Sequence, residues 1–338
     1  MSVCQFIFDG HERKPNMKGL YSAAAIIIFI CMVLFPLLSM RETVIPDTSK
    51  GNLPGITAEA PDSFRLLESE TGKVVNIGTD EYLCGVLAAE TGPTAGTEAL
   101  KAQAVAAYTF ACRKKASRNA ENFDISDDLA TDQAYISADV QKERWGGNYE
   151  QYRSNIASAV AAVKGEILVF GGEPALTVYH DISGGKTESA ENMWGTAYDY
   201  LVPVESVGDV LCPDYLSNVT VDTDKIKEAV SSLGGNADGD PSGWIGEPTR
   251  SASGTVLKIT VGGKEITGTE LRRALDLRSA NFDVSFSDNS FSFTVRGHGH
   301  GVGMSQYGAS FMALQGSSYK EILSWYYPGT ELLKQSKP

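Results

Sequence analysis

Apolar residues between positions 64 and 326 follow both helical and strand-like patterns, without a regular alternation of the two. Asp80 is placed to cap the first helix, and Gly92-Pro93 to end that region. We predict helices over 80–89, 97–115, 150–163, 270–277, 307–315 and 318–326. Paired strands are predicted over 64–69 with 73–78, 167–170 with 176–179, 256–261 with 265–267, and 282–286 with 291–295. This irregular order favours an α+β fold.

The longest apolar stretch covers residues 19–40 and contains no charged side chain. About 22 residues reach roughly 33 Å as a helix, which is enough to cross a bilayer. Arg13, Lys14 and Lys18 precede the stretch, so residues 1–18 are predicted to be cytoplasmic and the remainder extracytoplasmic. A cleaved signal peptide is the alternative, but its apolar region is normally shorter. We therefore predict a single-pass protein of the cell membrane.

The polar residues 41–62 contain prolines and read as a linker to one domain over 63–335. The net charge of −13 argues against a nucleic-acid binder, because such proteins carry a basic patch. Three cysteines fall in the predicted external part: Cys84, Cys112 and Cys212. They allow one disulfide with one free thiol, but three buried thiols is the simpler interpretation.

A glycine-rich segment at 296–309 reads RGHGHGVGMSQYGA. Such glycine density lets backbone approach backbone or a ligand. His298 and His300 would share one face of an extended backbone, which raises the alternative of a metal site. No acidic or cysteine set completes that site, and Ser305 lacks an identifiable Asp–His relay, so hydrogen bonding to backbone or sugar is favoured. Met304 is expected to pack in the core.

Glu90 ends the apolar run VLAA just before Gly92-Pro93. A carboxyl at that point would be partly desolvated, which raises its pKa and suits a general acid near neutral pH. The alternatives are an exposed residue at a helix end or a cap of the next helix. Glu98 is expected to belong to the N-terminal capping arrangement of that next helix.

Four blocks of sequence together resemble the stage II sporulation protein D family, and the resemblance runs from about residue 64 to residue 333. The blocks, in chain order, are EYLCGVLAAETGP with TEALKAQAVAAYTFA, SGGKTESAENMWG, TGTELRRALDLRSANFDV, and GHGHGVGMSQYGASFMALQGSSYKEILSWYYPGT.

The resemblance implies a membrane-anchored lytic transglycosylase that acts on peptidoglycan. Such an enzyme cleaves the β-1,4 bond from N-acetylmuramic acid to N-acetylglucosamine in denuded glycan strands and leaves 1,6-anhydro products. The implied setting is engulfment of the forespore, with sporulation proteins M and P as partners. The implied architecture is a two-lobed extracytoplasmic domain with a groove.

The resemblance also assigns roles to particular residues. Glu90 matches the catalytic acid. Trp194 can stack on a sugar or pack in the core, and the segment beginning at Ser183 can line the groove or form an ordinary turn. No cofactor and no metal are implied for this chain. The expected substrate-binding residues are Ser183, Gly184, Gly185, Thr187, Tyr200, His298, His300 and Gln306.

Three positions depart from the family pattern. Tyr108 and Val202 stand where Arg and Lys are usual, and those cations would help to hold substrate or tune the acid. Asp132 stands where some members carry Cys with zinc ligands nearby, so zinc is not expected here. These changes leave the fold prediction intact and put full catalytic activity in question.

Two other functions stay open at this point. A non-catalytic glycan-binding scaffold, or activator of a partner amidase, is favoured by the two missing cations. A plain glycosidase would need a second carboxyl across the groove, for which Asp181 and Glu188 are the candidates.

Overall fold

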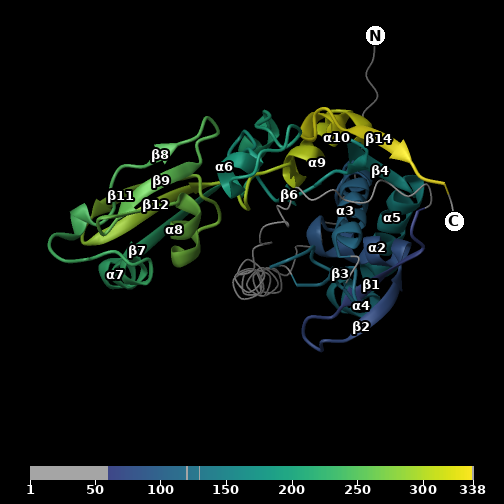
Figure 1. The fold of residues 1–338 in the computed structure, drawn as a ribbon, viewed down its shortest axis with the longest axis horizontal. Helices are drawn as coiled ribbons and strands as arrows, with labels where there is room; N and C mark the ends of the chain where they lie inside the picture. Colours follow the sequence, from purple (N-terminus) through teal and green to yellow (C-terminus); the bar gives the residue numbers. More distant parts are fainter. Residues whose placement is uncertain (1–59, 119–120, 129, 337–338) are drawn as a thin grey trace, which may run out of the picture. The chain divides into compact units, whose positions relative to one another are not determined.

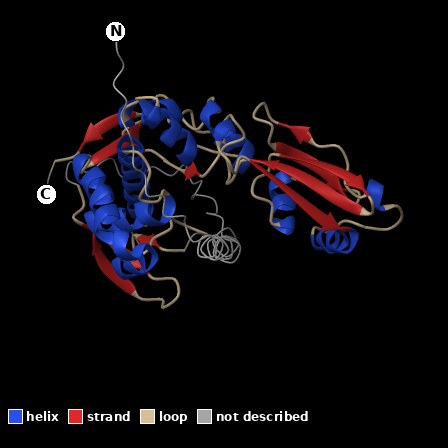
Figure 2. Ribbon diagram, turned by 180° about the vertical axis from the view of Figure 1, so that it is seen from behind, coloured by secondary structure: helices blue, strands red, loops and turns tan. Residues whose placement is uncertain are grey.

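The computed structural model describes residues 60–118, 121–128 and 130–336, all within one compact unit, Glu42–Pro338. Figures 1 and 2 show helices mixed with several small sheets, so the predicted α+β class is confirmed. The apolar segment 19–40, residues 1–18 and nearly all of the linker lie outside the described residues, and the boundaries of these regions stay predictions. Within the described part, no helix is both long and apolar enough to cross a membrane.

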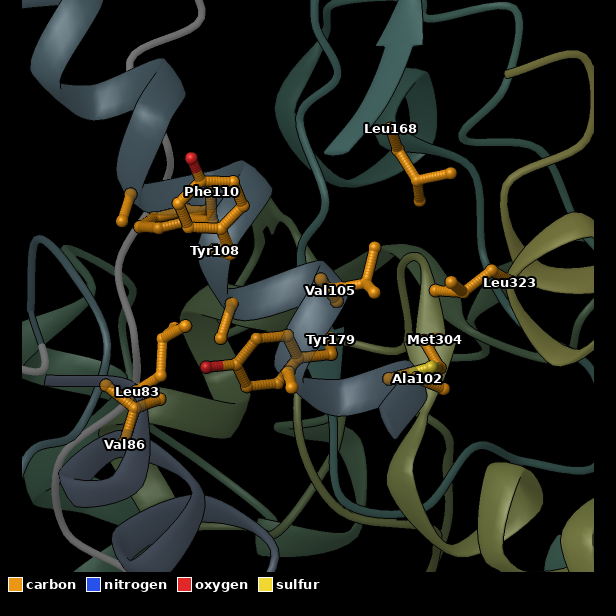
Figure 3. Close-up of a cluster of buried hydrophobic side chains, with 14 of the residues drawn as sticks. Leu83, Val86, Ala102, Val105, Tyr108, Phe110, Leu168, Tyr179, Met304 and Leu323 are labelled. Carbon is orange, nitrogen blue, oxygen red and sulfur yellow. The ribbon is translucent and has the colours of Figure 1, made fainter. Parts of the chain in front are cut away.

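The larger hydrophobic core surrounds helix α3 (Thr97–Ser117), whose small side chains let neighbours approach closely. Ala102, Ala104 and Ala106 are fully buried, as expected for a helix covered on several sides. Helices α2 (Thr79–Glu90) and α5 (Tyr149–Ala162) and strand β4 (Glu166–Phe170) pack against it. Figure 3 shows side chains of α2 and α3 close to Tyr179 and Met304 in this core. The prediction that Met304 is a core residue is confirmed.

A second hydrophobic cluster lies under the antiparallel sheet β11-β12-β7. Its strands are β7 (Leu216–Asp222), β11 (Phe282–Ser287) and β12 (Ser290–Arg296), whose alternating pattern buries Phe291, Phe293 and Val295 on one face. Helices α7 (Thr223–Ser232) and α8 (Gly268–Leu275) cover that face (Figure 1).

Three of the four predicted hairpins are confirmed. Strands β1 (Ser63–Leu67) and β2 (Val74–Gly78) pair with Phe64 opposite Ile77. Strands β9 (Val256–Val261) and β10 (Lys264–Ile266) form the second hairpin, and β11 with β12 forms the third. All six predicted helices are present within a few residues of the expected bounds.

The remaining hairpin was predicted wrongly. Strand β4 pairs with β5 (Glu173–Pro174) and with β14 (Glu331–Lys334) rather than with residues 176–179. The apolar run at 176–179 instead leads into β6 (Tyr179–His180), which pairs in parallel with β13 (Met304–Ser305). A parallel partner distant in sequence leaves no turn signal for local patterns to detect.

Two capping predictions were also wrong. Gly78 is the N-cap of α2, and Asp80 lies inside the first turn. Gly96 caps α3, and the Glu98 carboxylate instead pairs with Lys101 and accepts the backbone N–H of Tyr319 at 2.8 Å. Asp80 and Glu98 both lie in the first turn of their helices, where a negative charge interacts favourably with the positive end of the helix dipole.

The three cysteines in the described part of the chain form no disulfide. Cys84 is buried, and Cys112 and Cys212 are partly buried.

The remaining helices and strands are β3 (Ile125–Ser126), α4 (Ala138–Trp145), η1 (Gly146–Asn148), α6 (Ala190–Trp194), η2 (Val207–Leu211), η3 (Pro241–Gly243), β8 (Thr249–Arg250), α9 (Gln306–Leu314) and α10 (Tyr319–Tyr326).

The glycine-rich segment runs against the backbone around β6. His298 N–H donates to the Ile182 carbonyl at 2.7 Å, and Met304 N–H donates to the Val178 carbonyl at 3.2 Å. Gly303 has a φ of +71°, and a Cβ there would lie 2.1 Å from the Val178 oxygen. This position therefore requires glycine for its conformation and for its close backbone contact.

Gly303→Ala is expected to destabilise the fold more than Gly301→Ala. Both positions have positive φ, +71° and +79°, but a Cβ at Gly301 would meet its nearest atom at 3.6 Å. The two variants therefore share the backbone strain and differ in the clash, which should lower the free energy of unfolding by a further 1–3 kcal/mol, roughly. Denaturant unfolding measures the difference, and equal losses would contradict the close packing described here.

Candidate active site

Glu90 is the last residue of α2, and its carboxyl is held by a distant loop. The helix ends there because Gly92 adopts a φ of +77° and its N–H caps the Leu87 carbonyl. Glu90 Oε1 accepts the backbone N–H of Ala134 at 2.7 Å. The side chains of Tyr179 and Gln306 lie near the carboxyl. Residues from three separate parts of the chain therefore meet at this side chain.

Burial raises the pKa of Glu90 to about 7, and the negative charge of Asp181 acts in the same direction. The hydrogen bond from the Ala134 N–H favours the ionised form, as do the nearby polar side chains of Gln306 and Tyr179, and these effects oppose the shift. Near neutral pH the carboxyl is therefore present in both protonation states. That is the property a general acid needs to donate a proton and take one back.

The loop that carries Ala134 is held in place by buried ion pairs of Asp132 with Lys114 and Arg118. The side chain of Asp132 is fully buried, with Oδ1 3.1 Å from Lys114 Nζ and Oδ2 2.5 Å from Arg118. Lys114 Nζ also donates to the Thr131 carbonyl at 2.9 Å. The next residue, Gln133, accepts the Tyr179 hydroxyl at 2.8 Å and donates to the Tyr82 hydroxyl at 3.0 Å. The cluster thus fixes the loop that orients Glu90.

The two histidines of the glycine-rich segment have different partners, so the expectation of one shared face was wrong. Gly299, with a φ of +104°, interrupts the extended backbone between them. His298 Nδ1 lies 2.6 Å from Asp181 Oδ2. The His300 ring lies 5.3 Å from that of Trp194, in a small cavity of about 140 Å³, and burial lowers its pKa well below the usual range. In the described part of the chain, no group of three or more His, Cys, Asp or Glu side chains is arranged so that it could hold a metal ion.

The segment beginning at Ser183 is built around Asp209, a residue that the sequence patterns did not single out. Ser183 Oγ donates to Asp209 Oδ2 at 2.5 Å, and Ser305 Oγ donates to the other carboxylate oxygen at 2.8 Å. Asp209 thereby joins this segment to the start of α9, where Gln306 lies near Glu90. Its side chain is fully buried, so its signal lies only in three-dimensional contacts.

The other predicted binding residues also form hydrogen bonds or packing contacts within the protein itself. Thr187 Oγ1 accepts the Val204 N–H at 2.8 Å, and the Tyr200 hydroxyl accepts the Leu176 N–H at 2.7 Å from within the core. Gly184 packs tightly on Asn281, and Gly185 has a φ of +97°. Of the expected binding set, Gln306 lies near the carboxyl of Glu90. A role in substrate binding stays a prediction for all of them.

Comparison with known proteins gives the family of the chain. The family model described as stage II sporulation protein matches residues 68–170, which include Glu90 and the Ala134 loop. Stage II sporulation protein D of Bacillus subtilis is 36% identical over 277 residues, covering 81% of this chain and 79% of that protein. The chain belongs to the stage II sporulation protein D family.

Two further relatives extend the comparison. Stage II sporulation protein D of Bacillus amyloliquefaciens is 36% identical, with 87% of this chain and 83% of that protein covered. A Bacillus subtilis protein named amidase enhancer is 27% identical over 74% of this chain, which spans 40% of that protein. Family membership supports a cell-wall-acting protein connected with sporulation.

Tyr108, where the family resemblance led us to expect arginine, lies beside the start of α2, whereas Glu90 is the last residue of that helix. Its hydroxyl donates to Gln335 Oε1 at 2.7 Å, beside a cavity of about 530 Å³ at the start of α2. That cavity is lined by α2 as far as Glu81, and nine residues of helix, or ~14 Å, separate Glu81 from Glu90. Val202 stands at the other position where a cation was expected, and its carbonyl lies 3.4 Å from Thr187 Oγ1. The change at Tyr108 therefore leaves the immediate surroundings of the acid intact.

Glu90→Gln should make the protein's stability less sensitive to pH. The folded-state pKa of about 7 lies above the ordinary value of 4.5, so ionisation of Glu90 opposes folding between those pH values. The variant stays neutral and can keep the Ala134 hydrogen bond. The free energy of unfolding of the variant, relative to the wild type, should rise by at most about 3 kcal/mol between about pH 4.5 and pH 7 and stay constant above that. Denaturant unfolding from pH 4 to 9 measures this, and a constant difference would contradict the shifted pKa.

Asp132→Asn should strongly destabilise the loop that carries Ala134, the hydrogen-bond donor to Glu90. Removing one partner leaves Lys114 and Arg118 without their buried counter-charge, which costs roughly 3–5 kcal/mol. Asp283→Asn is the matched control, because Asp283 pairs with Arg250 and Arg296 at a half-exposed site where such pairs contribute at most about 1 kcal/mol. Equal unfolding midpoints for the two variants would contradict an anchoring role for Asp132.

Proposed function

We propose that the chain is a membrane-anchored lytic transglycosylase that cleaves the β-1,4 bond between N-acetylmuramic acid and N-acetylglucosamine in denuded glycan strands. The observation that carries the proposal is the carboxyl of Glu90, held by the Ala134 N–H and with a pKa raised to about 7 by its burial. Membership of the stage II sporulation protein D family supports the choice of cell-wall glycan as substrate.

In the proposed reaction Glu90 protonates the bridging oxygen while the bond from that oxygen to the anomeric carbon breaks. The 6-hydroxyl of the same sugar attacks the anomeric carbon, and its proton passes to the Glu90 carboxylate. The product is a 1,6-anhydro sugar, and no water is consumed. One group that gives and then accepts a proton is sufficient, which matches a carboxyl poised near neutral pH.

The setting of the proposed reaction comes from the sequence. Residues 19–40 anchor the chain with residues 1–18 in the cytoplasm, and the described domain acts outside. The glycan lies in a groove between the two lobes, along the glycine-rich segment. We propose that the protein works with sporulation proteins M and P during engulfment of the forespore.

A second candidate is a non-catalytic glycan-binding scaffold that activates a partner amidase. The specific observation in its favour is the 27% identical relative that is named amidase enhancer. The two functions differ in their dependence on Glu90, because a scaffold needs the fold but not the proton of that residue.

Digestion of purified denuded glycan strands by the full-length chain tests the proposed reaction. The wild type should release anhydro-terminated products, and Glu90→Gln should reduce their rate of release at least 10²-fold, roughly, since the proton donor is lost. Glu98→Gln is the control: Glu98 pairs with Lys101, away from the Glu90 carboxyl, and this variant should stay active.

The outcome separates the candidates. Glycan binding without cleavage, together with equal activation of an amidase by the wild type and Glu90→Gln, would favour the scaffold. Products with reducing ends would show hydrolysis in place of transglycosylation.

A further inference from the structure

We propose that Gln133 is a positioning residue for the acid: its buried side-chain amide fixes the peptide unit whose N–H, that of Ala134, holds the Glu90 carboxyl. This inference rests on the proposed function and adds a residue that acts on the acid without touching the substrate. The ion pairs of Asp132 hold the loop at the preceding residue, and Gln133 sets the direction of the donor itself.

The Gln133 amide forms hydrogen bonds to three different elements of the fold. Its Nε2 donates to the Tyr82 hydroxyl of α2 at 3.0 Å and to the Ala107 carbonyl of α3 at 3.2 Å. Its Oε1 accepts the Tyr179 hydroxyl of β6 at 2.8 Å. Both N–H groups of the amide and its carbonyl oxygen are therefore in use.

These bonds allow only one orientation of the amide. A flip of the amide plane would bring Oε1 to the Ala107 carbonyl, where two acceptors would face each other without a proton. The Gln133 side chain is 3% exposed, so water cannot satisfy the groups that such a flip would leave without partners. Gln133 is therefore fixed in both position and orientation.

A fixed Gln133 also fixes the N–H that follows it in the chain. The Gln133 carbonyl carbon and the Ala134 nitrogen belong to one planar peptide unit, so the direction of the N–H depends on where the Gln133 backbone lies. The Ala134 nitrogen lies 2.7 Å from Glu90 Oε1. The Gln133 amide thereby acts on the acid through the next residue.

The loop that contains Gln133 lies directly against α2, at a glycine. Ile136 N–H donates to the Gly85 carbonyl at 3.3 Å. A Cβ at Gly85 would lie 2.2 Å from the Tyr135 ring and 2.8 Å from the Ile136 carbonyl oxygen. Gly85 thus leaves the space that the loop occupies, and a methyl group there would push the loop away from α2.

Burial separates Gln133 from any contact with substrate. Its partners Tyr82 and Ala107 are fully buried, and Tyr179 is buried as well. Because a glycan cannot reach the amide, a change at Gln133 should act on kcat rather than on KM.

The Ala134 hydrogen bond also influences the protonation of Glu90. It favours the ionised form and lowers the pKa of the carboxyl, in opposition to burial. The other groups that act on the carboxyl are Asp181, Gln306 and Tyr179, which lie on other segments of the chain. Displacement of the loop should therefore raise the pKa of Glu90 above its value of about 7, while the loss of orientation lowers the rate.

Kinetics of the full-length chain on denuded glycan strands test the inference. Gln133→Met keeps the length of the side chain but removes its hydrogen bonds. It should lower kcat on the order of 10²-fold, because a displacement of the acid by roughly 1 Å has that effect, and it should leave KM unchanged. The basic limb of the pH–rate profile should move to higher pH, since the acid stays protonated further.

Gln335→Met is the matched control. Gln335 is also a buried amide whose Oε1 accepts a tyrosine hydroxyl, that of Tyr108, but it lies beside the start of α2 rather than its end. The control should lose a similar amount of stability and change neither kcat nor the pH–rate profile.

Gly85→Ala tests the same step without removing a hydrogen-bonding side chain, and it decides the question if Gln133→Met does not fold. It should also lower kcat and raise the pKa of Glu90, since it moves the loop off α2. Gly268→Ala is its control: a Cβ there would lie 2.3 Å from the Val256 oxygen, an equally close contact in the second hydrophobic cluster. That variant should leave kcat and the pKa of Glu90 unchanged.

The pKa of Glu90 can be measured without activity. The difference in infrared absorption between each variant and the same variant carrying Glu90→Gln, followed over pH, gives the titration of this one carboxyl. The inference predicts a higher midpoint in Gln133→Met and in Gly85→Ala than in the wild type.

Each outcome decides a different claim. A kcat within about twofold of the wild type, or an unchanged pKa of Glu90, in folded Gln133→Met and Gly85→Ala would overturn the inference. A raised KM with unchanged kcat would also overturn it, because Gln133 would then act on substrate binding. A wild type that releases no product would overturn the proposed function, and the pKa of Glu90 in the variants would still decide whether Gln133 positions the carboxyl.

Discussion

The contact between the Glu90 carboxyl and the Ala134 N–H is the constraint on which the site depends. It joins the end of α2 to a loop 44 residues further along the chain. The carboxyl is taken partly out of water, which favours its protonated form, while a single backbone donor keeps it in one orientation. The buried cluster of Asp132, Lys114 and Arg118 holds the loop that supplies this donor.

The glycine-rich segment fixes the backbone around β6 and the start of α9, which carry other neighbours of the same carboxyl. Its close backbone contacts with the residues around β6 fix Tyr179 and Asp181, and its continuation into α9 places Gln306. Asp209 joins this arrangement to the Ser183 segment through two serine hydroxyls. The motif that stands out most in the sequence therefore acts on the acid through neighbours, while the acid itself lies some two hundred residues earlier.

Local patterns predicted those parts of the fold that local interactions determine. The helices and three hairpins were predicted because their periodicity and turn residues lie within one segment. The pairing of β6 with β13 and of β4 with β14 was missed, because each partner lies more than 120 residues away. In the site, the place of Glu90 at the end of an apolar run made it a candidate, and the family resemblance assigned it the role of the acid. The Ala134 donor could not be, because a backbone N–H carries no residue-type signal.

A direct titration of the Glu90 carboxyl tests the central claim. The difference in infrared absorption between the wild type and Glu90→Gln, followed over pH, isolates the carbonyl band of the protonated side chain. A midpoint of about 7 is expected from the burial of the carboxyl and the neighbouring charge of Asp181. A midpoint near the ordinary value of 4.5 would contradict the account, because Glu90 would then be fully ionised at neutral pH and unable to serve as the acid.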